Sequence, residues 1–292
     1  MGRKTKVALT VGAASVAAWA ASKVVVKPEP RTEKKALQFS ENAVLAEIDI
    51  AEDPSVHSLT AFTKTADLGV HGFVVDIRLT KDEEIIIAPS SNLLPTGAIA
   101  DYTLAELKND YPSSPEQTET EADEDPSLIL PLRELLKMFP QLLIVISMGD
   151  SPDTYEGSLI PSKLWRLLKE MDAAERVVVT STFDEQIDRF NLYAQNSVAL
   201  GAGSEEIKKA YVAYTSKFGH LYRPNADLFC LTEKIGMFPL ASEGFIQFLQ
   251  QLNIAVFYEL SNTANIEKLA KLDIDGFTTK KSKEVLEYFN EN

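Results

Sequence analysis

The sequence of 292 residues has few of the side chains that build catalytic and metal sites. It has one cysteine, Cys230, which excludes a disulfide within the chain and a zinc site with two or more thiolate ligands. It has three histidines, His57, His71 and His220, so a histidine-rich metal site is also excluded. No glycine-rich dinucleotide fingerprint or phosphate loop follows the first predicted strand, which argues against a doubly wound nucleotide-binding fold.

Basic residues are scarce outside the N-terminal segment. The chain has 29 lysines and arginines against 43 aspartates and glutamates, a net charge of −14. Eight basic residues but only two acidic ones fall within the first 35 residues. Nucleic-acid binding needs clustered lysine and arginine, so the acidic remainder is not expected to bind nucleic acid. The composition, 45% hydrophobic and 25% charged, is otherwise that of an ordinary globular protein.

The N-terminal segment, residues 1–26, predicts a single membrane-spanning helix. Residues 7–26 carry one charge, Lys23, and about 20 residues suffice for a helix to cross the hydrocarbon core. Basic residues precede this stretch, so the positive-inside rule predicts a cytoplasmic N-terminus and an extracytoplasmic body. The alternative is secretion after cleavage of a signal peptide, because Ala18-Trp19-Ala20 has a small-x-small pattern. We favour the uncleaved anchor, because the apolar segment continues past this pattern.

Residues 27–43 are predicted as a linker, since two prolines and mixed charges interrupt any periodicity. Residues 44–292 alternate predicted strands with predicted helices. The strands are Val44–Ile50, Phe73–Ile77, Glu84–Ala88, Leu142–Ile146, Val177–Thr180, Val198–Leu200, Leu228–Leu231, Ile254–Tyr258 and Gly276–Thr278. The helices are Ser58–Leu68, Leu104–Leu107, Leu132–Phe139, Leu164–Met171, Asp184–Gln195, Ser204–Tyr214, Glu243–Gln251, Ile266–Lys271 and Lys283–Phe289. Eight mostly apolar strands plus one extra predict an α/β protein with a closed parallel (β/α)₈ TIM barrel.

Three further features have both a functional and a structural interpretation. The acidic loop 109–127 holds seven acidic residues and no basic one, so it could attract cations or a partner, but a solvated surface loop is the favoured interpretation. Gly201-Ala-Gly203 before a helix could cradle a phosphate, although a structural turn is favoured. Cys230, between apolar neighbours, is predicted to lie in the core.

An ordered set of motifs gives the body a resemblance to the glycerophosphodiester phosphodiesterase (GDPD) family. The matching segments span about Val44–Phe289 and are GVHGFVVDIRLTKD at Gly69–Asp82, DYTLAEL at Asp101–Leu107, LPLRELL at Leu130–Leu136, VTSTFD at Val179–Asp184, the strand Ile254–Phe257, and DGFTT at Asp275–Thr279. The resemblance implies a TIM barrel of the phospholipase-C-like phosphodiesterase type, with its chemistry at the C-terminal ends of the strands.

The resemblance also implies two catalytic histidines, a phosphate-binding arginine and a Ca²⁺ or Mg²⁺ ion held by carboxylates. Carried over residue by residue, the histidine positions fall on Glu47 and Pro89, and the arginine position falls on Ile48. The carboxylate positions fall on Val56, on Val74, and on Val145 or Ser147, and the aspartate after the last strand becomes Lys280. Asp76 alone remains as a metal-ligand position, and one carboxylate does not make a site for a hard divalent cation.

These substitutions predict a GDPD-like protein that is non-catalytic, a pseudoenzyme that needs no cofactor. The expected protein is anchored in a bacterial cell membrane through residues 7–26, with its barrel outside the cytoplasm. It would bind an envelope protein or a glycerophosphate-type ligand, in connection with lipid metabolism. The alternative is an active phosphoric diester hydrolase with a rebuilt site that uses Glu47 and Asp76, with Ser147 as a further candidate residue.

Overall fold

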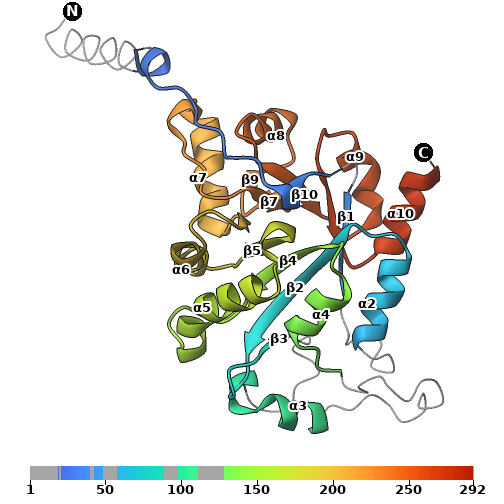
Figure 1. The fold of residues 1–292 in the computed structure, drawn as a ribbon. Helices are drawn as coiled ribbons and strands as arrows, with labels where there is room; N and C mark the ends of the chain where they lie inside the picture. Colours follow the sequence, from blue (N-terminus) through green and yellow to red (C-terminus); the bar gives the residue numbers. More distant parts are fainter. Residues whose placement is uncertain are drawn as a thin grey trace, which may run out of the picture.

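The computed structural model describes residue 19 and residues 21–39, 43–48, 58–88, 98–110 and 128–291. Eight parallel strands form its centre and helices surround them (Figure 1). In chain order the strands are β1 (Ala43–Glu47), β2 (Gly72–Leu79), β4 (Leu143–Met148), β5 (Val177–Thr180), β6 (Ala199–Leu200), β7 (Leu228–Leu231), β10 (Ala255–Glu259) and β11 (Gly276–Thr279). The predicted (β/α)₈ barrel is therefore confirmed.

The barrel closes between β6 and β7, where the pairing is thinnest. The strands follow one another in the order β6-β5-β4-β2-β1-β11-β10-β7. The two end strands meet through one parallel bridge, Gly201 with Leu228. Two backbone hydrogen bonds flank this bridge, from the Asp227 N–H to the Leu200 carbonyl at 2.7 Å and from the Ala202 N–H to the Leu228 carbonyl at 2.8 Å. We call this closure the β6–β7 seam.

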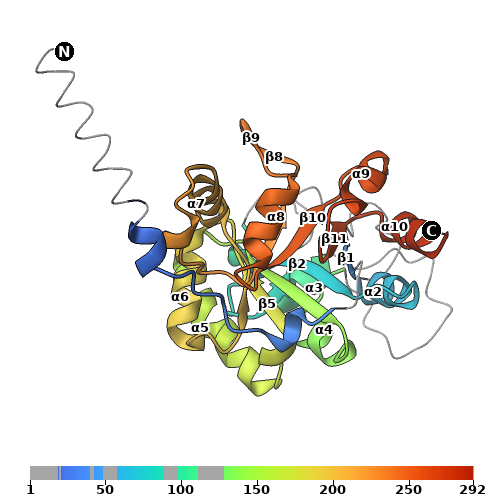
Figure 2. The same cartoon turned by 90° about the horizontal axis from the view of Figure 1, so that it is seen from above.

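The helices lie outside the barrel, and three short strands lie outside its parallel ring. The α-helices are α2 (Ser58–Asp67), α3 (Leu104–Asp110), α4 (Leu132–Met138), α5 (Tyr155–Glu170), α6 (Asp184–Ala194), α7 (Ser204–Thr215), α8 (Glu243–Gln250), α9 (Ile266–Ala270) and α10 (Ser282–Glu291). The 3₁₀ helices are η1 (Lys35–Leu37), η2 (Ile99–Asp101), η4 (Ala174–Arg176), η5 (Gly219–Leu221) and η6 (Thr263–Asn265). The short strands are β3 (Ile85–Ile87), which pairs antiparallel with β2, and the hairpin β8 (Lys234–Ile235) and β9 (Phe238–Pro239), which projects from the barrel (Figure 2).

Burial on both faces explains why the barrel strands are almost uniformly apolar. Small and medium side chains from several strands fill the barrel interior, and Phe257 is the one large ring among the fully buried members. The opposite faces of the same strands pack under the helices in two larger apolar clusters. The barrel interior is thus a packed core for most of its depth, as is usual for this fold.

Helix α5 begins at Tyr155, nine residues before the predicted start at Leu164. It continues through Pro161 because a long-range contact replaces the hydrogen bond that the proline cannot make. Thr154 caps the helix by accepting a hydrogen bond from the Gly157 N–H at 3.0 Å. Pro161 has no N–H to donate to the Gly157 carbonyl, four residues earlier. The buried Gln186 amide on α6 donates to that carbonyl instead, at 2.9 Å. A partner 29 residues away therefore satisfies the group that the proline leaves open.

The segment predicted as a linker packs against the barrel. Residues 26–39 cross the end where the strands begin, and η1 together with Phe39 covers the interior at that end. The Phe39 ring meets Phe257 edge to face, with 5.3 Å between ring centroids.

The predicted membrane helix falls mostly on residues 1–18 and 20, which lie outside the described residues. Within the described part of the chain, no helix is both long and apolar enough to cross a bilayer. Most of the acidic loop 109–127 also lies outside the described residues, since the description stops at Asp110 and resumes at Leu128.

Candidate functional site: the mouth of the barrel

The C-terminal ends of the strands surround a cavity of about 450 Å³, which we call the mouth. Its polar lining includes Glu47 from β1, Asp76 from β2, Ser147 from β4 and Glu259 from β10. Strand register explains why these side chains meet: Asp76 pairs with Ser147, and Glu259 pairs with Thr278 of β11. The structure therefore brings the three candidate residues Glu47, Asp76 and Ser147 into one cavity, of a size typical of small-molecule sites.

Glu47 is the most perturbed carboxyl group of the mouth. Its pKa is raised, first by burial and then by the negative charges of Glu259 and Asp76. Lys280 and a hydrogen bond with the Thr278 hydroxyl oppose this shift. Glu47 is therefore easier to protonate than an ordinary glutamate, because the ionised form is poorly hydrated and faces like charge.

The core prediction for Cys230 is wrong. Leu228 and Cys230 point into the barrel, while the alternate residues Phe229 and Leu231 pack under the helices. Because Cys230 is the last inward residue of β7, its thiol is exposed in the mouth rather than packed in the core. Surrounding protein atoms and the charges of Glu47 and Glu259 raise its pKa to about 12, so the thiol stays protonated at neutral pH and is a weak nucleophile.

Apolar side chains occupy three described positions where the resemblance implies polar groups, those of Ile48, Val74 and Val145. Ile48 packs against apolar core residues. Val74 and Val145 line the lower part of the mouth and pair with each other, and Val145 is fully buried. Of the two β4 candidates for a lost carboxylate, Ser147 lies one step nearer the open end. Pro89, Val56 and His57 lie outside the described residues.

The described carboxylates of the mouth do not fit a divalent cation. Among the described residues, no group of three or more histidine, cysteine, aspartate or glutamate side chains is placed to share a metal ion. Calcium and magnesium sites need several converging oxygen ligands. Two of the strand positions that line the cavity hold the apolar side chains of Val74 and Val145 instead.

Glu259 was missed by the sequence analysis. The predicted strand stops at Tyr258, and no motif marks the residue that follows it. Strand β10 extends one residue further, and pairing with Thr278 places Glu259 beside Glu47 in the mouth. The available signal was its position: a charged residue directly after an apolar parallel strand falls at the end of the barrel that carries chemistry.

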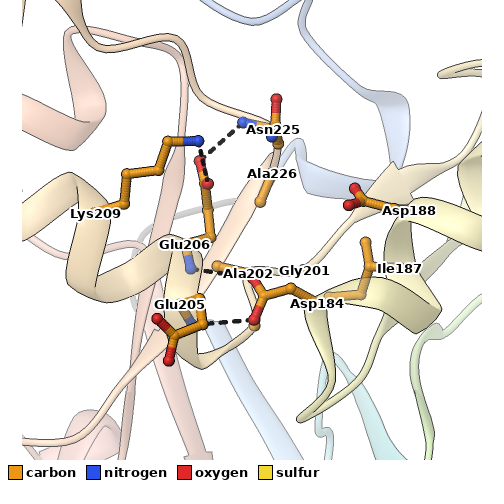
Figure 3. Close-up of a pocket in the computed structure, with 11 residues that line it drawn as sticks. Asp184, Ile187, Asp188, Gly201, Ala202, Glu205, Glu206, Lys209, Asn225 and Ala226 are labelled. Carbon is orange, nitrogen blue, oxygen red and sulfur yellow. Dashed lines mark hydrogen bonds and ion pairs between the residues drawn. The ribbon is translucent and has the colours of Figure 1, made fainter. Parts of the chain in front are cut away.

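A second cavity, of about 180 Å³, lies between α6 and α7 behind the Gly201-Ala-Gly203 turn (Figure 3). The Asp184 carboxylate accepts hydrogen bonds from the Glu205 and Glu206 N–H groups, each at 3.0 Å. These are the first-turn donors of α7 that a phosphate would use. A carboxylate of the chain thus occupies the anion position, which supports the structural-turn interpretation of this glycine motif.

Buried Glu206 belongs to the same structural network. Its carboxylate accepts a hydrogen bond from the Tyr222 hydroxyl at 2.5 Å. It also accepts one from the Asn225 N–H at 3.0 Å and forms an ion pair with Lys209 (Figure 3). Burial and the charge of Glu206 raise the pKa of Tyr222, so the phenol remains a hydrogen-bond donor. These contacts connect α7 to the loop before β7.

The two described histidines lie away from the mouth. His71, just before β2, accepts a hydrogen bond through Nδ1 from the Val44 N–H at 3.1 Å, and burial lowers its pKa. His220 in η5 hydrogen-bonds through Nε2 with the Ser22 hydroxyl at 2.8 Å. Trp165 packs edge to face on Phe190. Each of these side chains has a structural contact far from the carboxylates of the mouth.

The structure defines a (β/α)₈ barrel with polar groups at the C-terminal ends of its strands. Comparison with known proteins specifies which kind of barrel it is. Neither a protein-family model nor a curated protein sequence matches the chain. Solved structures do match, at low sequence identity. A glycerophosphodiester phosphodiesterase from Agrobacterium tumefaciens str. C58 has a TM-score of 0.62 and 12% identity, over 84% of this chain and 99% of that chain.

Two other solved structures give the same result. The glycerophosphoryl diester phosphodiesterase domain of a Mycobacterium tuberculosis protein has a TM-score of 0.65 and 15% identity, over 86% of this chain and 100% of that domain. A glycerophosphodiester phosphodiesterase from Thermotoga maritima has a TM-score of 0.60 and 17% identity, with 86% and 100% coverage. The chain therefore has the barrel fold of the glycerophosphodiester phosphodiesterase structures, as its motifs predicted.

Proposed function

We propose that this chain is a GDPD-like barrel, anchored in the membrane through residues 7–26, that binds a ligand or an envelope partner without hydrolysing a phosphodiester. One observation carries the proposal: the described lining of the mouth holds three carboxylates and no histidine or arginine. In this family's chemistry, as the resemblance implies it, two histidines move protons while a cation and an arginine balance the phosphate charge.

Electrostatics explain why the fold alone does not supply the activity. A phosphodiester is an anion, and its hydrolysis places more negative charge on the phosphoryl oxygens. Efficient catalysis needs positive charge or aligned donors aimed at those oxygens. Here Glu47, Asp76 and Glu259 present like charge, and the cationic side chains Lys280 and Lys281 belong to an adjoining cavity at the rim. The mouth therefore suits a neutral or zwitterionic ligand better than an anionic one.

The second candidate is an active hydrolase with a rebuilt site, and the raised pKa of Glu47 favours it. A general acid works best when its pKa approaches the ambient pH, and burial beside like charge moves Glu47 in that direction. Asp76 lies in the same cavity and would be the complementary base. Serine, cysteine and threonine groups also line the mouth, but its described lining holds no histidine to serve as their base.

A direct assay separates the two candidates. The purified full-length chain is incubated with glycerophosphocholine or glycerophosphoglycerol in the presence of calcium or magnesium, and released glycerol phosphate is measured. We expect no release above the protein-free background. Turnover that is lost in Asp76→Ala and Glu47→Gln but kept in Glu175→Gln would establish the hydrolase and overturn the proposal. Glu175 is a suitable control because it is exposed beside β5 at the opposite end of the barrel.

A further inference from the structure

The N-terminal end of the barrel is crossed by one continuous segment, residues 21–39, which we call the strap. Three of its basic side chains reach residues that shortly precede barrel strands. Arg31 binds Asp227 before β7, Lys34 donates to the Asn196 carbonyl before β6, and Lys35 binds Glu175 before β5. Because the strands are parallel, their beginnings share one end of the barrel, and the strap is attached to that end.

The start of the described chain is held against the turn after α7. The Trp19 indole donates to the Lys217 carbonyl at 3.2 Å, and the Ser22 hydroxyl meets His220 at 2.8 Å. Residues 21–25 lie beside one end of α7 in both views (Figures 1 and 2). Trp19 and Ser22 therefore fix the place at which this segment joins the barrel.

Exposed apolar and basic side chains gather where this sequence arrives. We call them the basal patch: Lys23, Val24, Val25, Lys217, Phe218 and Leu221. Val24 and Val25 are each 80% exposed, Phe218 is 44% exposed and Leu221 is 46% exposed. Lys23 and Lys217 line one cavity of about 450 Å³ between the strap and the turn after α7. The patch is basic and apolar, although the body as a whole is strongly acidic.

We infer that the basal patch rests on the surface of a bilayer that contains anionic lipid, so that the N-terminal end of the barrel faces the membrane. Apolar side chains beside lysines suit the headgroup boundary, where the apolar groups are buried and the lysines meet lipid phosphates. The inference rests on the proposed membrane anchor, because continuity with the uncharged sequence of residues 7–22 selects a lipid surface rather than a second protein. The mouth, at the opposite end, then points away from the membrane and takes its ligand from the aqueous phase.

Orientation is measured on the full-length chain reconstituted into vesicles of phosphatidylcholine and phosphatidylglycerol. In a Cys230→Ser background, one cysteine is placed at Leu221→Cys or at Met237→Cys and labelled with an environment-sensitive fluorophore. Met237 is 94% exposed at the tip of the β8–β9 hairpin, which follows β7 at the mouth end. Lipids that carry a spin-label quencher near the headgroup should quench the probe at residue 221 and leave the probe at residue 237 unquenched.

The remaining outcomes overturn the inference. Equal quenching at both positions, stronger quenching at residue 237, quenching at neither, or failure of the chain to float with the vesicles would each exclude this orientation. A change in the emission of the probe at residue 221 that occurs without quencher lipid, and that decreases on dilution with unlabelled chain, would assign the patch to contact with a second copy.

Charge variants test the role of the anionic lipid. Lys217→Glu should reduce quenching of the probe at residue 221 on phosphatidylglycerol vesicles, and so should replacement of phosphatidylglycerol by phosphatidylcholine. Lys208→Glu is the matched control, because Lys208 lies on α7 outside the basal patch and pairs with Glu205. Equal losses in the two variants would contradict the inference. Circular dichroism establishes that each variant is folded.

Discussion

The two ends of the barrel use their charged groups in opposite ways. At the N-terminal end, the Asp227 carboxylate is 1% exposed and accepts hydrogen bonds from Arg31 at 2.7 and 3.0 Å and from the Leu200 N–H at 2.9 Å. At the C-terminal end, Glu47 faces Glu259 and Asp76, and this repulsion together with burial raises its pKa. The β6–β7 seam joins opposite charges, and the mouth collects three carboxylates in one cavity.

This difference shows that the scaffold and the chemistry of a (β/α)₈ barrel are separable. Arg31 and Asp227 brace the β6–β7 seam, where the strand ladder is thinnest, so the strap contributes to closing the barrel. In the mouth, by contrast, the described carboxylates face like charge. Ile48 and Val74, near this end, pack against apolar neighbours instead. The following variants test this contrast, from the largest expected effect to the smallest.

Removal of Arg31 should have the largest effect. In Arg31→Ala, the buried Asp227 carboxylate loses its cationic partner, and breaking such a pair costs about 3–5 kcal/mol when both groups are buried. Arg31 keeps 16% of its side chain exposed, so we expect a loss of about 2–4 kcal/mol in the free energy of unfolding, measured with urea. Lys35→Ala, which removes an exposed ion pair of the same strap, should cost about 0–1 kcal/mol. Equal losses would contradict a specific role for Arg31 at the seam.

Asp184 should have an intermediate effect. Asp184→Ala removes the acceptor of two first-turn N–H groups of α7, and loss of such a cap costs about 1 kcal/mol, up to about 2. Asp188→Asn is the control on the same helix. Burial and the charges of Asp184 and Glu206 raise the pKa of Asp188, so removing its charge should leave stability unchanged or slightly increased. A larger loss in Asp188→Asn than in Asp184→Ala would contradict the capping role.

Glu47→Gln should have the smallest effect, and its sign should depend on pH. The pKa of Glu47 is raised in the folded state, so the unfolded chain releases this proton first as the pH rises above about 4.3. Stability from this group is therefore present at low pH and is lost as the pH rises toward the folded pKa. The variant should gain up to about 0.5–1 kcal/mol over the wild type near pH 7 and less near pH 4, in urea titrations at both values. A gain that is larger near pH 4 would show that Glu47 is not destabilised by its neighbours.

The strand-helix alternation and the barrel could be predicted from the sequence, whereas the assignment of Glu47, Ile48 and Pro89 to catalytic positions stays a prediction. These properties are local: a run such as Leu142–Ile146 specifies a buried strand, and a motif position is read directly from the residue that occupies it. The extent of α5 could not be predicted this way, because Pro161 is accommodated only through Gln186, a residue of the next helix.

Which side chains meet at the mouth was decided by the tertiary structure. Successive side chains of a strand point to opposite faces of the sheet. On a strand that is apolar on both faces, the sequence does not show which face lines the barrel interior. For that reason Cys230 was assigned to the core, although it is the inward residue at the end of β7, and Glu259 was missed. Arg31 and Asp227, 196 residues apart, have no local pattern that pairs them. The residue types at each position belong to the sequence, but their partners exist only once the barrel has closed.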